Sequence, residues 1–379
     1  MLKKFFAAML AIIASTTLFA DITLETATLP GAQLIVTADS ALLKDSLFMS
    51  YMEKAREAQK ELVGEYGELY KKFEMMLPPG AKNNDKSLIA IASSKLNGTM
   101  DEIMAADVTP EDASFIGAVS YPVSVKDLFD AAAILPMDPG FNEHFTLTPL
   151  AIADYKSYEI VAKDDMAFKV AVVLSKDGKT ILFGTPDAVK AQLTAPKKFD
   201  AEAEKVLAQL KGNAAGVAFI LPEGIRKGLK EAWVDDASFD AAIRDALSGI
   251  KTLVFTTNST AATIDVALLG ITTTAEQADV LKKSLIDVQV IPMAQGLVPM
   301  FIEGASFGNT LASTANADVV KVSVSFTEAD IAACKAAFDT LNAADEIEMI
   351  EEETVEEMPA DGIEMIEEET VEEMPADAE

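Results

Sequence analysis

The first candidate for chemistry is the pentapeptide Gly-Ala-Ser-Phe-Gly at residues 304–308, which fits the G-x-S-x-G pattern of a serine nucleophile elbow. Such an elbow needs a preceding strand, a following helix and a histidine later in the chain. The only histidine, His144, lies far upstream of Ser306, and residues 309–317 favour a loop before a strand. A glycine-rich turn therefore explains the pattern better than a nucleophile.

Two more short patterns have the wrong surroundings. Ser248 and Lys251 fit S-x-x-K, but the companion motifs of the penicillin-binding class are not recognisable. Residues 178–180 (Gly-Lys-Thr) resemble the end of a phosphate-binding loop, yet Val173 stands where its first glycine must be. We predict neither activity from them.

Metal and acid–base chemistry have few candidates. One histidine and one cysteine exclude most zinc and copper sites, which need several nitrogen or sulfur ligands. His144 lies in a Pro-rich loop, where a surface role is expected. The adjacent carboxylates Asp164-Asp165 and Asp235-Asp236 favour solvated turns, although carboxylate pairs formed in space cannot be seen in a sequence. We predict no catalytic, cofactor-binding or metal-binding residue.

The N-terminus predicts export. Lys3 and Lys4 precede an apolar run, and Asp21 opens a polar stretch, so residues 1–20 fit a signal peptide cleaved after Ala20. The alternative is an uncleaved anchor, but the run is shorter than the ~20 residues of a spanning helix. No later segment is expected to reach spanning length, which predicts a soluble periplasmic or secreted protein.

The cysteine content limits which covalent modifications the chain can carry. Cys334 is the only cysteine, so no intramolecular disulfide can form, and its distance from the cleavage region excludes an N-terminal lipidated cysteine. Its apolar helical surroundings predict a buried structural thiol.

The charge balance restricts the partners. The chain carries 61 acidic against 31 basic residues, a formal charge of −30. Such a chain repels phosphate backbones, so we expect no nucleic-acid binding, and anionic lipid surfaces are disfavoured for the same reason. Cations, or a basic or envelope protein bound through the tail or the 45–77 helix, are the expected partners.

The C-terminal tail contains an internal repeat. Ile347–Asp361 reads IEMIEEETVEEMPAD, and Ile363–Asp377 repeats it after Gly362. Seventeen acidic residues and no lysine or arginine follow from Asp345 onward, which predicts a disordered tail over residues 345–379. The alternative is a pair of short helices that fold on a partner.

Alternating patterns predict strands and helices between residues 21 and 344. Asp177-Gly178 is a strong hairpin signal, and Thr185-Pro186 is typical of a helix start. We expect irregular structure from Pro136 to Pro149. The expected strands are 33–38, 87–92, 114–120, 158–162, 168–174, 180–183, 217–221, 252–257, 263–269 and 319–325. The expected helices are 42–77, 123–133, 186–193, 201–210, 225–234, 239–248, 275–286 and 328–341, with an unassigned apolar stretch after residue 286.

Hairpins outnumber strand–helix–strand units, so the predicted fold class is α+β with mixed or mainly antiparallel sheet covered by helices. We expect two similar halves, residues 21–195 and 196–344, with the boundary near Pro196-Lys197-Lys198.

The predicted helix 42–77 has an apolar seam at four- and three-residue spacing, the pattern of a heptad repeat. Self-packing on the sheet is expected, and contact between the 45–77 helix and a partner or second copy is the alternative. The seam consists of Phe48, Met52, Ala55, Gln59, Leu62, Tyr66, Leu69, Phe73 and Met76.

Two segments resemble uncharacterised exported bacterial α+β proteins. They are Tyr158–Leu193, with its Asp-Gly hairpin and GTPDAVKAQL helix entry, and the opening LPGAQLIVTADSALLKDSLF. The resemblance implies the α+β class and assigns no functional residue. We therefore expect a non-catalytic binding or interaction protein. The alternatives are a carboxylate-dependent periplasmic hydrolase and a structural envelope-associated component.

Overall fold

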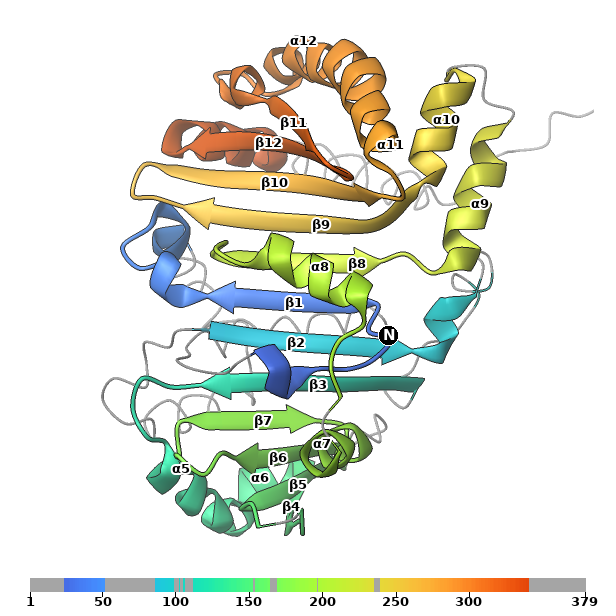
Figure 1. Ribbon diagram of the computed structural model, residues 1–379. Coiled ribbons are helices and arrows are strands. Elements are labelled where there is room, and N and C mark those ends of the chain that lie inside the picture. The colour runs from blue at the N-terminus through green and yellow to red at the C-terminus, as the bar shows by residue number, and fades with distance from the viewer. Residues whose placement is uncertain are drawn as a thin grey trace, which may run out of the picture.

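The computed structural model describes residues 24–51, 86–98, 102, 105, 112–152, 154–163, 169–195, 197–234 and 239–340. The predicted signal peptide, most of the 42–77 helix, both carboxylate pairs and the acidic repeats lie outside these residues. Within them, all strands join one 12-stranded sheet in the order β11-β12-β10-β9-β8-β1-β2-β3-β7-β6-β5-β4, and every pairing is antiparallel (Figure 1). The α+β prediction is therefore confirmed.

The strands are β1 (Leu34–Asp39), β2 (Lys86–Ser93), β3 (Ala113–Ser120), β4 (Phe145–Pro149), β5 (Ser157–Ala162), β6 (Lys169–Leu174), β7 (Thr180–Gly184), β8 (Ala215–Ile220), β9 (Ile250–Ser259), β10 (Thr263–Thr272), β11 (Ala312–Asn316) and β12 (Val319–Thr327). The helices are α5 (Lys126–Ala131), α6 (Pro139–His144), α7 (Pro186–Thr194), α8 (Ala201–Leu210), α9 (Glu223–Val234), α10 (Ala241–Ser248), α11 (Ala275–Val280) and α12 (Ile291–Phe301), with the π-helical segment η6 (Leu281–Val290) between the last two. Short 3-10 helices are η1 (Leu24–Ala27), η2 (Ser40–Leu42), η3 (Ser94–Asn97), η5 (Ala132–Met137) and η7 (Phe307–Thr310). Residues 328–340 form a last helix.

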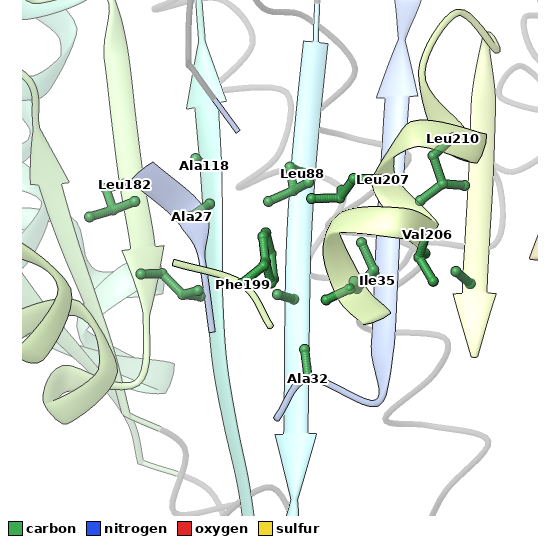
Figure 2. Packing of buried hydrophobic residues seen from close by; sticks show 14 of the residues in the cluster. Ala27, Ala32, Ile35, Leu88, Ala118, Leu182, Phe199, Val206, Leu207 and Leu210 are labelled. Carbon is green, nitrogen blue, oxygen red and sulfur yellow. The ribbon is translucent and has the colours of Figure 1, made fainter. Parts of the chain in front are cut away.

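The main core lies between the sheet and α8. This helix buries Ala203, Val206, Leu207 and Leu210, whose i, i+3, i+4, i+7 spacing puts them on one face. The carboxylate of Asp200 caps the helix by accepting a hydrogen bond from Ala203 N at 2.9 Å. Figure 2 shows Val206, Leu207 and Leu210 of α8 in the same buried cluster as Phe199 and as Ile35, Leu88, Ala118 and Leu182 of the sheet.

The two predicted halves share this sheet and this core. Strand β1 pairs with β8, so that Val36 lies opposite Val217 at the centre of the sheet. The core cluster includes Leu182 from the first half and Val254 from the second. The division into two units at residue 196 stays a prediction, but no break in the sheet accompanies it.

The β6–β7 hairpin confirms the prediction from Asp177-Gly178. Gly178 has a φ of +72°, and the Asp177 carboxylate accepts a hydrogen bond from Lys179 N at 3.0 Å. The helix start expected at Thr185-Pro186 is confirmed, because α7 begins at Pro186, but the Thr185 side chain does not cap it. Its hydroxyl caps no amide of α7 and instead donates to the Phe115 carbonyl at 3.5 Å, which holds the helix entry on β3.

Several predicted boundaries are wrong. The helix expected from Leu42 begins at residue 47, because Ser46 acts as its cap and Asp45 adopts a φ of 58° just before it. The stretch from Pro136 to Pro149, expected to be irregular, contains α6 and β4; the Asp138 carboxylate caps α6 at Gly140 N. The loop expected at 309–317 contains β11, whose five polar and small residues give no apolar alternation.

The β11–β12 turn offers a test of stored strain. Ala317 has a φ of 48°, a left-handed conformation that costs an L-residue roughly 1–2 kcal/mol. We expect Ala317→Gly to raise the free energy of unfolding by about 1 kcal/mol, measured by urea denaturation. The control Ala315→Gly, in the adjacent strand, should instead lower it. A lower stability for Ala317→Gly would contradict the strain argument.

Candidate functional site

A continuous helical arm, Ala275–Phe301, is the most unusual feature in the described part of the chain. It comprises α11, η6 and α12 and follows the β11–β12 edge of the sheet (Figure 1). Its 27 residues are long and apolar enough to cross a membrane by length and composition, yet only 6% of its most apolar stretch is buried. The expectation that no later segment reaches spanning length is therefore wrong.

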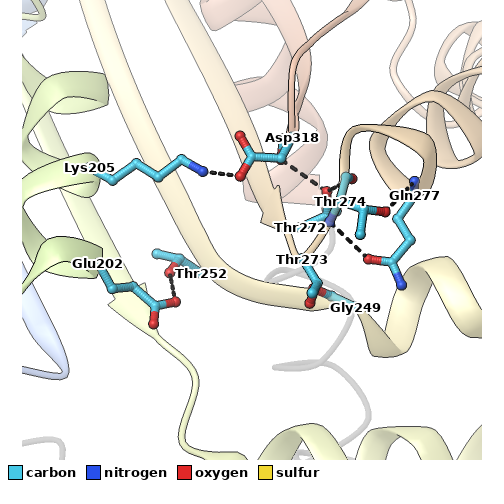
Figure 3. A network of polar contacts seen from close by, with 9 residues as sticks. All are labelled: Glu202, Lys205, Gly249, Thr252, Thr272, Thr273, Thr274, Gln277 and Asp318. Carbon is cyan, nitrogen blue, oxygen red and sulfur yellow. Dashed lines mark hydrogen bonds and ion pairs between the residues drawn. The ribbon is translucent and has the colours of Figure 1, made fainter.

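The first end of the arm is held by a polar network (Figure 3). Thr274 and Gln277 form a reciprocal capping box, in which the Thr274 hydroxyl accepts from Gln277 N at 3.3 Å and the Gln277 carboxamide accepts from Thr274 N at 3.2 Å. The Thr272 hydroxyl donates to the Thr274 carbonyl at 2.8 Å. Thr272 N also donates to the Asp318 carbonyl at 2.8 Å, and the Asp318 carboxylate pairs with Lys205 of α8. The start of the arm is thus tied to both the sheet and α8.

The middle of the arm packs on the sheet. Leu281 and Ile286 of η6 are buried with Val320 of β12. Asp287 accepts a hydrogen bond from the Ser313 hydroxyl of β11 and pairs with Lys282 at 2.6 Å. The Lys282 and Ser313 hydrogen bonds lower the pKa of Asp287, so this carboxylate stays ionised at neutral pH.

The far end of the arm is fixed by Asp330, which is 1% exposed. One carboxylate oxygen accepts from Ser306 N at 2.5 Å, Ser306 Oγ at 3.0 Å and Phe307 N at 3.0 Å. The other accepts from Thr327 N at 2.9 Å and Thr327 Oγ1 at 2.6 Å. Burial alone would raise the pKa of Asp330, but the hydrogen bonds from Thr327 and Ser306 outweigh it and hold the pKa well below its usual value.

This arrangement gives Ser306 a structural setting. Its hydroxyl donates to Asp330, whereas His144 ends α6 beside the opposite edge of the sheet, with nine strands between β12 and β4. The elbow pattern therefore brings no histidine to this serine. The second pattern also has a structural setting: the Ser248 hydroxyl donates to the Asp245 carbonyl at the end of α10, and Lys251 lies in β9.

Cys334 is only half-buried on the helix 328–340, so the prediction of a buried thiol is wrong in degree. Burial is the main cause of its raised pKa, and the nearby Asp330 carboxylate adds to it. A raised pKa keeps the sulfur in the thiol form, which is the less reactive form.

Between the two anchored ends, α12 is apolar on nearly every side. No charged residue occurs between Asp287 and Glu303. Ile291, Ala294 and Val298 are half-buried on the inner side of α12. The exposed large side chains of the arm are Val288 (64%), Val290 (36%), Met293 (60%), Leu297 (41%), Met300 (76%) and Phe301 (74%). A helix that is apolar all round is normally covered by protein or lipid, so this surface requires an explanation.

The sheet has a second exposed apolar surface, on the face opposite α8. Val217, Phe255 and Leu268 are direct cross-strand neighbours, and Leu253 adjoins them on β9. Their exposed fractions lie between 36% and 49%. The same row continues into buried Val36 and Ile89, so only part of this face is open.

A depression of about 560 Å³ lies where β2, β3 and α7 meet. Two carboxylates, Asp112 and Asp187, border it, but Asp112 pairs with Lys95 at 2.6 Å and Asp187 is exposed in the first turn of α7. The described residues contain no cluster of three or more metal-ligating side chains. The depression is open rather than an enclosed cleft around two carboxylates, which gives the hydrolase alternative no specific support.

Comparison with known proteins identifies no family. No family model matches the chain, and no curated protein matches it. Solved structures of TP0453 are similar to it at low scores. Crystal form III is 8% identical with a TM-score of 0.38, covering 84% of this chain and 98% of that one. Crystal form IV is 9% identical with a TM-score of 0.38, covering 84% and 97%. At these values the likeness supports no functional argument.

Proposed function

We propose that the mature chain is an exported, non-catalytic protein that docks on a lipid bilayer through the arm Ala275–Phe301. The observation that carries the proposal is the apolar, solvent-exposed α12, which is held out at the edge of a rigid sheet. Full burial of one Met or Phe side chain is worth about 1.5–3 kcal/mol, so covering several of them in lipid supplies a large driving force.

The anchoring of both ends favours a helix that lies in the membrane interface over one that spans the bilayer. Thr274 ties the start of the arm to β10, and Ser306 ties the segment after its end to Asp330, beside the end of β12. A spanning helix has its ends on opposite sides of the bilayer, whereas both ends here are attached to one sheet. The uncharged stretch 288–302 is also only roughly 22 Å long at 1.5 Å per residue, against ~30 Å for a hydrocarbon core.

Charge favours neutral lipid. The two described lysines of the arm are already paired, Lys282 with Asp287 at 2.6 Å and Lys283 with Asp279 at 2.5 Å. The whole chain carries a charge of −30, so anionic headgroups repel it at low salt. We therefore expect binding to phosphatidylcholine vesicles that exceeds binding to phosphatidylglycerol vesicles, with the difference shrinking as salt rises.

The test is vesicle co-sedimentation of residues 21–379. We expect the double variant Met300→Gln/Phe301→Gln to bind phosphatidylcholine vesicles at least tenfold more weakly than the parent chain, because two of the most exposed apolar groups become polar. The control is Phe338→Gln, which alters another exposed aromatic (62%) on the helix 328–340 and should leave binding unchanged.

Two results would overturn the proposal. One is a parent chain that does not sediment with any vesicle. The other is equal binding by the parent and the double variant. If the parent instead forms a dimer that Met300→Gln/Phe301→Gln dissociates, the arm is an interface between copies of the chain and the structural-component alternative is the better one.

A further inference from the structure

The middle of the arm, η6, is a π-helix rather than an α-helix. It closes with a hydrogen bond from Ile291 N to the carbonyl of Ile286, five residues earlier in the chain. π-Helices occur mostly as single turns, often at functional sites, whereas η6 runs for 10 residues. A π-helical stretch of this length therefore needs side-chain contacts that hold its register.

Burial along this part of the arm repeats every five residues. Leu281 (2% exposed) and Ile286 (8%) are both buried in the cluster with β12, whereas Val288 (64%) and Met293 (60%) are both exposed. At 3.6 residues per turn, positions five apart would lie about 140° from each other, so an α-helix would not place them on one side. An α-helical register would instead bury Leu281, Leu285 and Val288, which are also apolar. The sequence thus permits two registers, and the structure adopts the π-helical one.

The ion pair between Lys282 and Asp287 has the same five-residue spacing. The ammonium and carboxylate groups lie 2.6 Å apart, and their side chains are only 26% and 35% exposed. Charged pairs in an α-helix are three or four residues apart, because those positions are neighbours on its surface. The Asp287 carboxylate also accepts a hydrogen bond from the Ser313 hydroxyl, which ties this turn to β11. The pair therefore fits the π-helical register and would be broken in the α-helical one.

The register of η6 determines which side of α12 faces outward. Helix α12 continues η6 without a break, so a change of register in η6 rotates α12 about its own axis. In the observed register Met293 and Met300 are exposed on the outer side. On the inner side Val298 lies close to Gly308 of η7, where a Cβ built on the glycine would be 3.5 Å from Cβ of Val298. A rotated α12 would move the two methionines away from their outward position.

We propose that the Lys282–Asp287 pair positions the docking surface, because it holds η6 in the π-helical register and so keeps the apolar outer side of α12 exposed. The lipid-binding part of this inference rests on the proposed function, whereas the control of the register does not. Lys282 and Asp287 are positioning residues, and neither needs to contact lipid. Loss of the pair should let η6 relax to the α-helical register, in which Val288 becomes buried.

The test compares thiol alkylation at two nearby positions in the absence of lipid. Val288→Cys and Ile286→Cys are made separately in residues 21–379 that also carry Cys334→Ser. The thiol at position 288 should react at least tenfold faster than the thiol at position 286, because Val288 is exposed and Ile286 is buried. Adding Lys282→Met should lower this ratio of rates at least tenfold.

Two comparisons separate the pair from a general loss of stability. The matched control Lys283→Met removes the 2.5 Å pair with Asp279, whose four-residue spacing fits an α-helix, and should leave the ratio unchanged. The exchanged pair Lys282→Asp/Asp287→Lys should restore the parent ratio. A ratio that Lys282→Met does not change, or that the exchange does not restore, would overturn the proposal.

Vesicle binding then tests the consequence for docking. We expect Lys282→Met to bind phosphatidylcholine vesicles at least threefold more weakly than the parent chain, and Lys283→Met to bind them equally well. An altered alkylation ratio with unchanged vesicle binding would contradict the positioning role. If the parent chain itself does not sediment with vesicles, the proposed function and the positioning role both fail, while the alkylation ratio still decides whether the pair holds the register.

Discussion

Asp330→Asn is expected to lower the free energy of unfolding by about 2–4 kcal/mol, the largest effect of any single polar substitution considered for this protein. The carboxylate accepts hydrogen bonds from Ser306, Phe307 and Thr327, and it is 1% exposed. An asparagine keeps one acceptor oxygen but turns an NH₂ group toward one of these donors. The loss should appear in urea denaturation and as faster amide exchange at residues 304–307.

The pH dependence gives this prediction a second readout. The pKa of Asp330 is lowered on folding, so its contribution to stability is present above the unfolded-state pKa of about 4 and is lost as the pH falls toward the folded-state value. The stability difference between the parent and Asp330→Asn should be constant from about pH 5 to 8 and shrink below about pH 4. The control Asp339→Asn, at an exposed pair with Lys335, should cost less than about 0.5 kcal/mol. Equal effects of both substitutions would contradict the role assigned to Asp330.

Gly117→Ala is expected to cost about 2–3 kcal/mol, because the centre of the sheet has no room for a methyl group there. A Cβ on residue 117 would lie 2.4 Å from Cζ of Phe183 on the paired strand β7. The ring cannot move freely, since it packs against the cluster of Val36, Ile89 and Ile91. The unsubstituted glycine therefore accommodates the aromatic ring lying across it.

A double-mutant cycle tests this contact. In a Phe183→Ala background the ring is absent, so adding Gly117→Ala should lower the free energy of unfolding by less than about 1 kcal/mol. The coupling energy between positions 117 and 183 should therefore be at least about 1 kcal/mol. Gly228→Ala is the control: nothing lies within 4 Å of its added Cβ in α9, and helix propensity should make it stabilising by about 0.5–1 kcal/mol. Additive effects of the two substitutions at 117 and 183 would refute the steric explanation.

Local patterns predicted most of the strands and helices but not their assembly. Helix α8 was predicted with its observed bounds, because Asp200 caps it and its apolar residues repeat at helical spacing. The strands β9 and β10 were predicted as residues 252–257 and 263–269, because two apolar runs flank a short turn, and they pair in an antiparallel register. Pairing of β1 with β8 could not be predicted, since register between distant strands depends on tertiary contacts that no local pattern records.

The candidate site was largely missed for a different reason. The stretch after residue 286 was recognised as apolar, but Pro292, Gly296 and Pro299 argue against a helix there. In the structure Pro292 lies in the first turn of α12, where its missing N–H costs nothing, and Pro299 lies near the end. The role of Asp330 was equally hidden, because its donors come from residues 306 and 307 as well as from Thr327 at the end of β12.

The β1–β8 pairing also sets the order in which the polypeptide can mature. Residues 34–38 gain their partner on one side only when residues 215–219 are available, and no earlier strand among the described residues takes that place in the sheet. Contacts between such distant positions form slowly, because a long loop must close first. A nascent chain that emerges N-terminus first therefore remains without its central strand pair through more than half of its synthesis. If the predicted signal sequence directs export, a late-forming central strand pair would favour an unfolded chain at the time of threading through a translocation pore.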